Sequence, residues 1–124
     1  MSARTIWLFR IGLFVAIIIA VTMALLPNPP HLPIDRFGDK AEHMLAFSTM
    51  ALLAALAYPR ASLVRIGERL SFLGALVEVM QSIPALHRDC DIRDWIADTL
   101  AICVVLLIVG TIRRRSTIVG KTLH

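Results

Sequence analysis

The sequence has little charge for its length. Only 18% of its 124 residues are charged, whereas 57% are hydrophobic, against about 25% charged and 45–50% apolar residues in an average soluble domain. The length suits one domain, so no second domain is there to cover the apolar surplus. The composition therefore excludes a water-soluble monomer and predicts a single membrane domain, residues 1–124, in contact with a lipid bilayer.

Aromatic residues and cysteines are also scarce. Aromatics make up 6% of the chain, and neither basic cluster carries the aromatic side chains on which single-stranded nucleic acids stack. The net charge of +4 is therefore not interpreted as a sign of nucleic-acid binding. Cys90 and Cys103 form no CxxC motif, and the predicted arrangement holds them too far apart for a disulfide.

Apolar segments, in contrast, fill most of the chain. Each approaches the roughly 20 residues that a helix needs to cross about 30 Å of hydrocarbon. A proline, which rarely continues a helix, closely follows each of the first three. A secretory signal is the alternative for the first segment, but its apolar run is long and no Ala-x-Ala site follows. The predicted fold class is all-α, a four-transmembrane-helix bundle with spans at about 7–26, 41–58, 66–83 and 94–112, the last closed by Arg113–Arg115.

The basic residues predict how this bundle is oriented. Nine of the thirteen Lys and Arg residues fall on the side of the two termini, and basic residues collect on the cytoplasmic side of membrane proteins. Both termini are therefore expected in the cytoplasm, with the chain in a bacterial inner membrane. Eight of the nine acidic residues fall on the outer side, Glu68 being the exception. Acids contribute little to orientation, so this gathering needs a separate reason, and the function is sought there.

The start of the second span contains the first candidate site residues. Asp39 and Glu42 have the spacing of a capping box, and acids suit a helix N-terminus. His43 lies one turn beyond Asp39 on the same face. Such a pair can orient an imidazole for proton transfer or offer two ligands to a metal. The alternative is a packing histidine with a polar tip.

The third span carries a face of small residues that leads to a carboxylate. Ser71, Gly74 and Ala75 predict close packing of a neighbouring helix. Glu78 lies within an apolar segment, where an ionisable group is costly unless it is paired or hydrated. Gln81, one turn further, is expected to share its pocket and to orient the carboxylate or a ligand.

The outer loop and the fourth span supply the remaining candidates. Asp91, Asp94 and Asp98 follow helical spacing on one stripe. An N-cap explains Asp91, with Asp94 in the first turn, but it does not explain Asp98, one turn deeper. Arg88 is the expected counter-charge, since its planar guanidinium suits these carboxylates or the phosphate of a ligand.

The order and spacing of these residues resemble the VanZ-like family of small integral membrane proteins, over about residues 38–105. The matching positions are Asp39, Lys40, His43 and Phe47, then Glu78 and Gln81, then Pro84, Arg88, Asp91 and Asp94. The family closes this pattern with Asn-Thr-x-Gly, where this chain has Asp98-Thr99-Leu100-Ala101. The resemblance implies membership of a group named for low-level resistance to teicoplanin-type glycopeptides, and it implies no settled biochemical activity.

The function expected from these residues is binding of a polar cell-envelope ligand, such as a lipid head group or a glycan precursor, at the outer face. The sequence assigns no metal site and leaves the cofactor unknown. It also leaves open whether a cation is bound and whether the chain oligomerises. A membrane-embedded enzyme acting on a lipid-linked substrate, an ion pathway and a structural assembly role are the alternatives. The predicted ligand-binding residues are Asp39, His43, Glu78, Gln81, Arg88, Asp91, Asp94 and Asp98.

Overall fold

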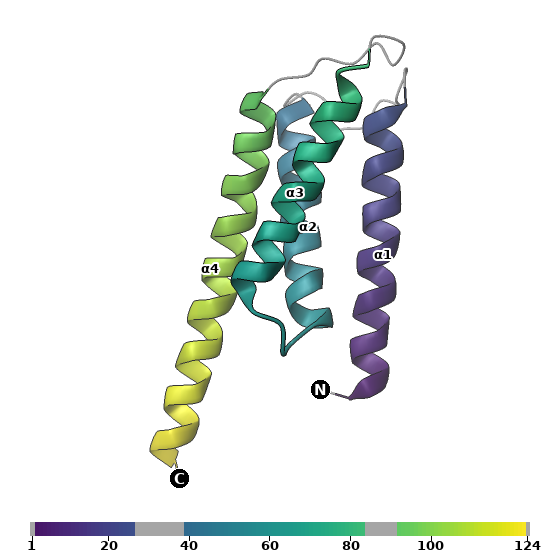
Figure 1. Ribbon diagram of the computed structural model, residues 1–124. Helices are drawn as coiled ribbons and strands as arrows, with labels where there is room; N and C mark the ends of the chain where they lie inside the picture. The colour runs from purple at the N-terminus through teal and green to yellow at the C-terminus, as the bar shows by residue number, and fades with distance from the viewer. Residues whose placement is uncertain (1, 27–38, 84–91, 124) are drawn as a thin grey trace.

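The computed structural model describes residues 2–26, 39–83 and 92–123. Four α-helices and no strand make up this part of the chain: α1 (Ala3–Leu25), α2 (Asp39–Ala57), α3 (Leu63–Gln81) and α4 (Ile92–Leu123). The helices lie side by side and alternate in direction along the chain (Figure 1). The all-α prediction is confirmed for the described residues.

The helices begin two to four residues before the apolar segments that predicted them. Two of these starts have a serine N-cap: the Ser2 hydroxyl accepts from the backbone N–H of Thr5, and the Ser62 hydroxyl accepts from that of Arg65. A polar first turn is stable when a side chain caps its free N–H groups. A helix can therefore begin before its apolar segment does. The first three helices end two or three residues before Pro27, Pro59 and Pro84.

The fourth helix differs most from its prediction. The predicted span ends at Ile112, whereas α4 continues to Leu123 and reaches past the other helices (Figure 1). Arg113–Arg115 ends the apolar run, but arginine is a good helix former. No proline follows it in α4, so the charge marks the end of the apolar segment and not the end of the helix.

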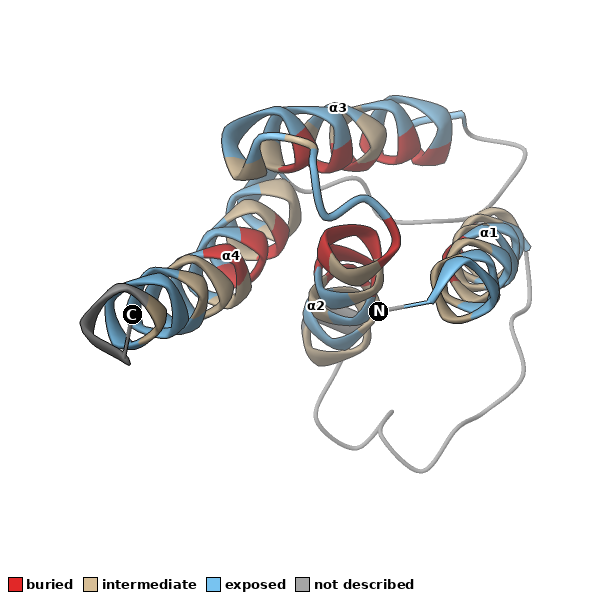
Figure 2. Ribbon diagram, turned by 90° about the horizontal axis from the view of Figure 1, so that it is seen from below, coloured by how far each residue is buried: buried red, intermediate tan, exposed pale blue. Residues whose placement is uncertain are grey.

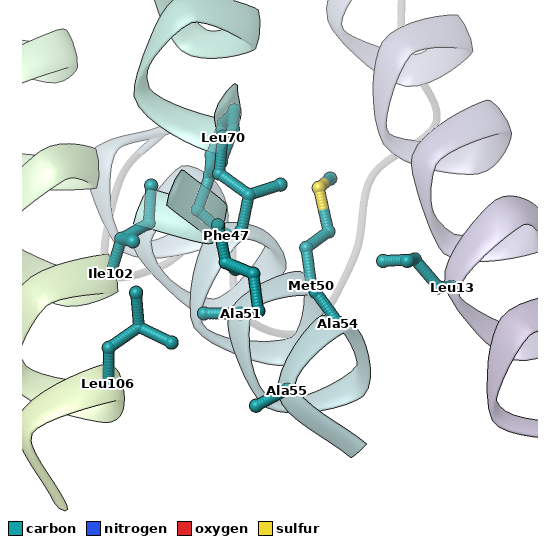
Figure 3. Close-up of a cluster of buried hydrophobic side chains, with 10 residues drawn as sticks. Leu13, Phe47, Met50, Ala51, Ala54, Ala55, Leu70, Ile102 and Leu106 are labelled. Atoms are coloured by element: carbon teal, nitrogen blue, oxygen red, sulfur yellow. The ribbon is translucent and has the colours of Figure 1, made fainter. Parts of the chain in front are cut away.

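Helix α2 lies at the centre and contacts each of the other three helices (Figure 2). Its inward face carries several alanines, which let neighbouring helices approach closely. Met50 is fully buried in a core cluster to which the other three helices contribute leucines and isoleucines (Figure 3). The core cluster consists of Leu13, Phe47, Met50, Ala51, Ala54, Ala55, Ile66, Leu70, Ile102 and Leu106.

Large apolar side chains are exposed on all four helices. Phe14 on α1 is 66% exposed, Phe72 on α3 is 65% exposed and Leu107 on α4 is 70% exposed. Helices α1 and α4 are long and apolar enough to cross a membrane. Contiguous exposed apolar surface of this kind needs cover from lipid or another protein.

Two arginines hold the C-terminal end of α2, an arrangement the sequence did not reveal. Arg113 of α4 donates to the carbonyl oxygen of Ala55 at 2.6 Å, and Arg10 of α1 donates to that of Ala57 at 3.0 Å. The Arg10 guanidinium also lies over the rings of Trp7 and Tyr58. These bonds satisfy carbonyls that a helix end leaves without intrahelical partners, and they tie three helices together.

Candidate functional site

Polar residues from three helices gather at one end of the molecule. The alternating directions bring the C-terminal ends of α1 and α3 to the same end as the N-terminal ends of α2 and α4 (Figure 1). Among the described acids, Glu68 alone lies towards the opposite end, which carries most of the described arginines. The acids at the polar end are Glu42, Glu78, Asp94 and Asp98.

Three of the predicted residues converge, each from a different helix. His43 lies in the second turn of α2, Glu78 in the last turn of α3 and Asp94 in the first turn of α4. One donor atom from each of the three lies within 4.8 Å of the other two. Glu78 is buried, and the other two are half-buried. The arrangement can bind a cation or hold a ligand by several polar contacts.

Asp98 lies beside this triad and is almost inaccessible. Its side chain is 3% exposed, and its Oδ2 atom lies 3.9 Å from Nδ1 of His43. Neither Oδ1 of Asp98 nor Nδ1 of His43 has a hydrogen-bond partner among the residues that the structure describes. Buried polar atoms are nearly always hydrogen-bonded, so both retain capacity for a ligand. His43, Glu78, Asp94 and Asp98 are termed the polar cluster below.

Gln81 joins the polar end to α1. Its Nε2 atom donates to the carbonyl oxygen of Ala24 at 2.9 Å, and the residue is only 2% exposed. Its Oε1 atom is buried and accepts no hydrogen bond within the described ranges. The sequence suggested that Gln81 orients a carboxylate or a ligand. In the structure its amide nitrogen also holds the end of α1 against α3.

An apolar groove leads away from the polar cluster. It has a volume of about 380 Å³ and lies between α1, α2 and α3, with walls that include Ala20, Ala46 and Leu73. Glu42 and His43 also line it, and Oε1 of Glu42 is buried without a hydrogen-bond partner in the described part of the chain. The capping-box pattern had explained Glu42, so its place in the groove was missed; its position next to His43 was the available signal.

A second groove, of about 880 Å³, lies between α3 and α4. Its lining includes Gly67, Thr99 and Leu106, and at the arginine-rich end of the molecule Glu68 and Arg114. Cys103, exposed on α4, also borders it. No member of the polar cluster lines this groove, so of these two grooves it is the first that joins apolar walls to the predicted site.

The packing of α3 against α4 positions the acids. The indole N–H of Trp95 donates to the carbonyl oxygen of Ser71, whose hydroxyl lies 2.9 Å from that of Thr99. A Cβ atom at Gly74 would lie 3.4 Å from Cδ1 of Trp95 and 3.5 Å from Cζ of Phe47. The close helix packing predicted from the small residues is confirmed at Gly74.

Three predicted site residues lie outside this description. Arg88 and Asp91 fall beyond the described residues, and of Asp39 the structure describes only that α2 begins there. The expected pairing of Arg88 with the carboxylates therefore stays a prediction.

Comparisons of the chain with protein-family models, with curated protein sequences and with solved structures find no match.

Proposed function

We propose that this chain is a four-span integral protein of the bacterial inner membrane, with both termini in the cytoplasm. Its support is the apolar outward surface, which covers α2 and α3 as well as the two long apolar helices; Leu52 and Val79 are examples. Helices α2 and α3 have 19 residues each. This gives a length of about 28 Å at about 1.5 Å per residue, which is close to the hydrocarbon thickness. The arginine-rich end then faces the cytoplasm.

Reporter fusions test this orientation. Green fluorescent protein, which folds to its fluorescent form in the cytoplasm, is expected to fluoresce when fused to the C-terminus or after the α2–α3 connection at residues 58–62. Alkaline phosphatase is expected to be inactive at both positions, because it needs the oxidising periplasm to form its disulfides. An active phosphatase at either position would overturn the four-span arrangement.

We further propose that the chain is a VanZ-like protein that binds an envelope lipid, with the head group at the polar cluster and an acyl chain in the apolar groove. The observation that carries this proposal is that His43 belongs to both: it lies beside Asp98 and also lines the groove. A concave apolar site with a few convergent polar groups is the usual form of a ligand pocket.

The character of the head group follows from the cluster. Glu42, Glu78, Asp94 and Asp98 offer carboxylate oxygens, and the His43 imidazole lies beside them. Carboxylates accept hydrogen bonds from amines and hydroxyls. The preferred lipid therefore carries an amine or several hydroxyls, and a phosphate binds where a cation bridges it to the carboxylates.

Native mass spectrometry of the protein released from mild detergent tests lipid binding. We expect about one retained lipid per wild-type chain and roughly tenfold less in Glu78→Gln, the effect of losing about 1.4 kcal/mol of binding free energy. The matched control is Glu68→Gln, which changes an exposed glutamate on the same helix away from the polar cluster. Equal lipid retention in the wild type and both variants would reject the binding site.

A further inference from the structure

The polar cluster has the composition of a transition-metal site. His43, Glu78 and Asp94 provide one imidazole and two carboxylates whose donor atoms lie within 4.8 Å of one another. Donors that bind one tetrahedral ion at about 2.0–2.2 Å lie about 3.3–3.6 Å apart. Side-chain shifts of up to about 1 Å therefore bring all three onto one ion.

A second observation points to the same centre. Asp98 is 2% exposed, faces Nδ1 of His43 at 3.9 Å and has an Oδ1 atom without a hydrogen-bond partner in the described part of the chain. A ligating histidine usually donates its other ring N–H to a carboxylate, which fixes the orientation of the ring. Asp98 is placed to do this for His43.

The negative charges of the polar cluster also favour the binding of a cation. Glu78, Asp94 and Asp98 together bring three negative charges when ionised, and like charges this close repel one another. A divalent ion lowers this total from minus three to minus one. Imidazole together with carboxylates suits zinc and related divalent metals.

We propose that His43, Glu78 and Asp94 bind a divalent transition-metal ion of the zinc class, and that Asp98 is a positioning residue that orients His43. Three protein ligands leave a coordination position open. The inference builds on the proposed function, because the open position is where the lipid's phosphate or hydroxyl oxygen binds. It adds a cation that the sequence did not assign.

Metal binding is measured on protein purified without a polyhistidine tag, stripped with EDTA and re-equilibrated with Zn²⁺ in detergent. Inductively coupled plasma mass spectrometry is expected to find about one zinc per wild-type chain. Competition with a chromogenic chelator is expected to show at least tenfold weaker binding in His43→Gln and Asp94→Asn. Asp98→Asn is expected to weaken binding roughly 10- to 100-fold, as the loss of an orienting carboxylate does elsewhere, and Glu68→Gln to leave it unchanged.

A spectroscopic test needs no variant. Co²⁺ added to the stripped wild-type protein is expected to give the visible absorption of a four- or five-coordinate site, and excess Zn²⁺ is expected to abolish it. Less than about a tenth of a zinc per chain, together with an octahedral aqueous Co²⁺ spectrum, would overturn the metal site. If zinc is absent but lipid retention still depends on Glu78, the metal site is rejected and the lipid site is supported. If zinc binds but no lipid is retained, the lipid site is rejected and the metal site is supported.

Discussion

The double substitution Arg10→Met and Arg113→Met is expected to lower the free energy of unfolding by about 3 kcal/mol, because each hydrogen bond from a charged donor contributes about 1.5 kcal/mol or more. Both guanidinium groups donate to carbonyl oxygens at the end of α2. Ala55 and Ala57 are buried, so water does not readily replace the lost donors. The variant also loses the stacking of Arg10 on Trp7 and Tyr58.

The matched control is Arg4→Met with Arg115→Met. It removes the same number of positive charges from exposed positions on the same two helices, so it separates the loss of the hydrogen bonds from the loss of net charge. Titration with SDS from dodecylmaltoside micelles, followed by circular dichroism, measures both unfolding energies. Equal losses in the two double variants would contradict a role for the α2 carbonyls.

Gly74→Leu is expected to destabilise the fold by about 2–3 kcal/mol, as overpacking of a close contact does. Even a Cβ atom at this position reaches van der Waals contact with Trp95 and Phe47, so the further atoms of leucine force α3 away from its neighbours. Trp95 follows Asp94 directly, and Phe47 lies one turn after His43. Separation of the helices there also pulls the polar cluster apart, and lipid retention should fall with stability.

Two further glycine variants test the packing explanation with the same SDS titration. Gly74→Ala is expected to leave stability nearly unchanged or slightly higher, because its Cβ fits at 3.4 Å and alanine favours a helix. Gly120→Leu is expected to be neutral, since a Cβ there meets nothing within 4 Å among the described residues. A neutral Gly74→Leu would show that α3 does not pack tightly at this point.

The number of helices and the polar character of one end could be predicted from the sequence. Apolar runs separated by prolines define the helices, and an ionisable residue within such a run stands out, as Glu78 and Asp98 do. The structure brings these two carboxylates to one place with His43 and Asp94.

Other features depend on how the helices cross, and local sequence patterns carry no information on the crossing of helices. The partners of Arg10 and Arg113 are backbone carbonyls of another helix, so only the interhelical register reveals them. Glu42 was explained by a local capping pattern, although its side chain lines a groove built from three helices. The extension of α4 beyond Ile112 was missed because hydropathy defines an apolar span and not the length of a helix.

Photocrosslinking with a lipid that carries a diazirine in its acyl chain tests the lipid site most directly. The protein is reconstituted in vesicles containing the probe, irradiated and digested, and the labelled residues are mapped. Labelling is expected to concentrate on groove residues such as Ala20, Ala46 and Leu73 and to fall in Glu78→Gln but not in Glu68→Gln. Labelling spread evenly over outward residues such as Phe72 and Leu107, and unchanged by Glu78→Gln, would contradict a lipid site in this groove.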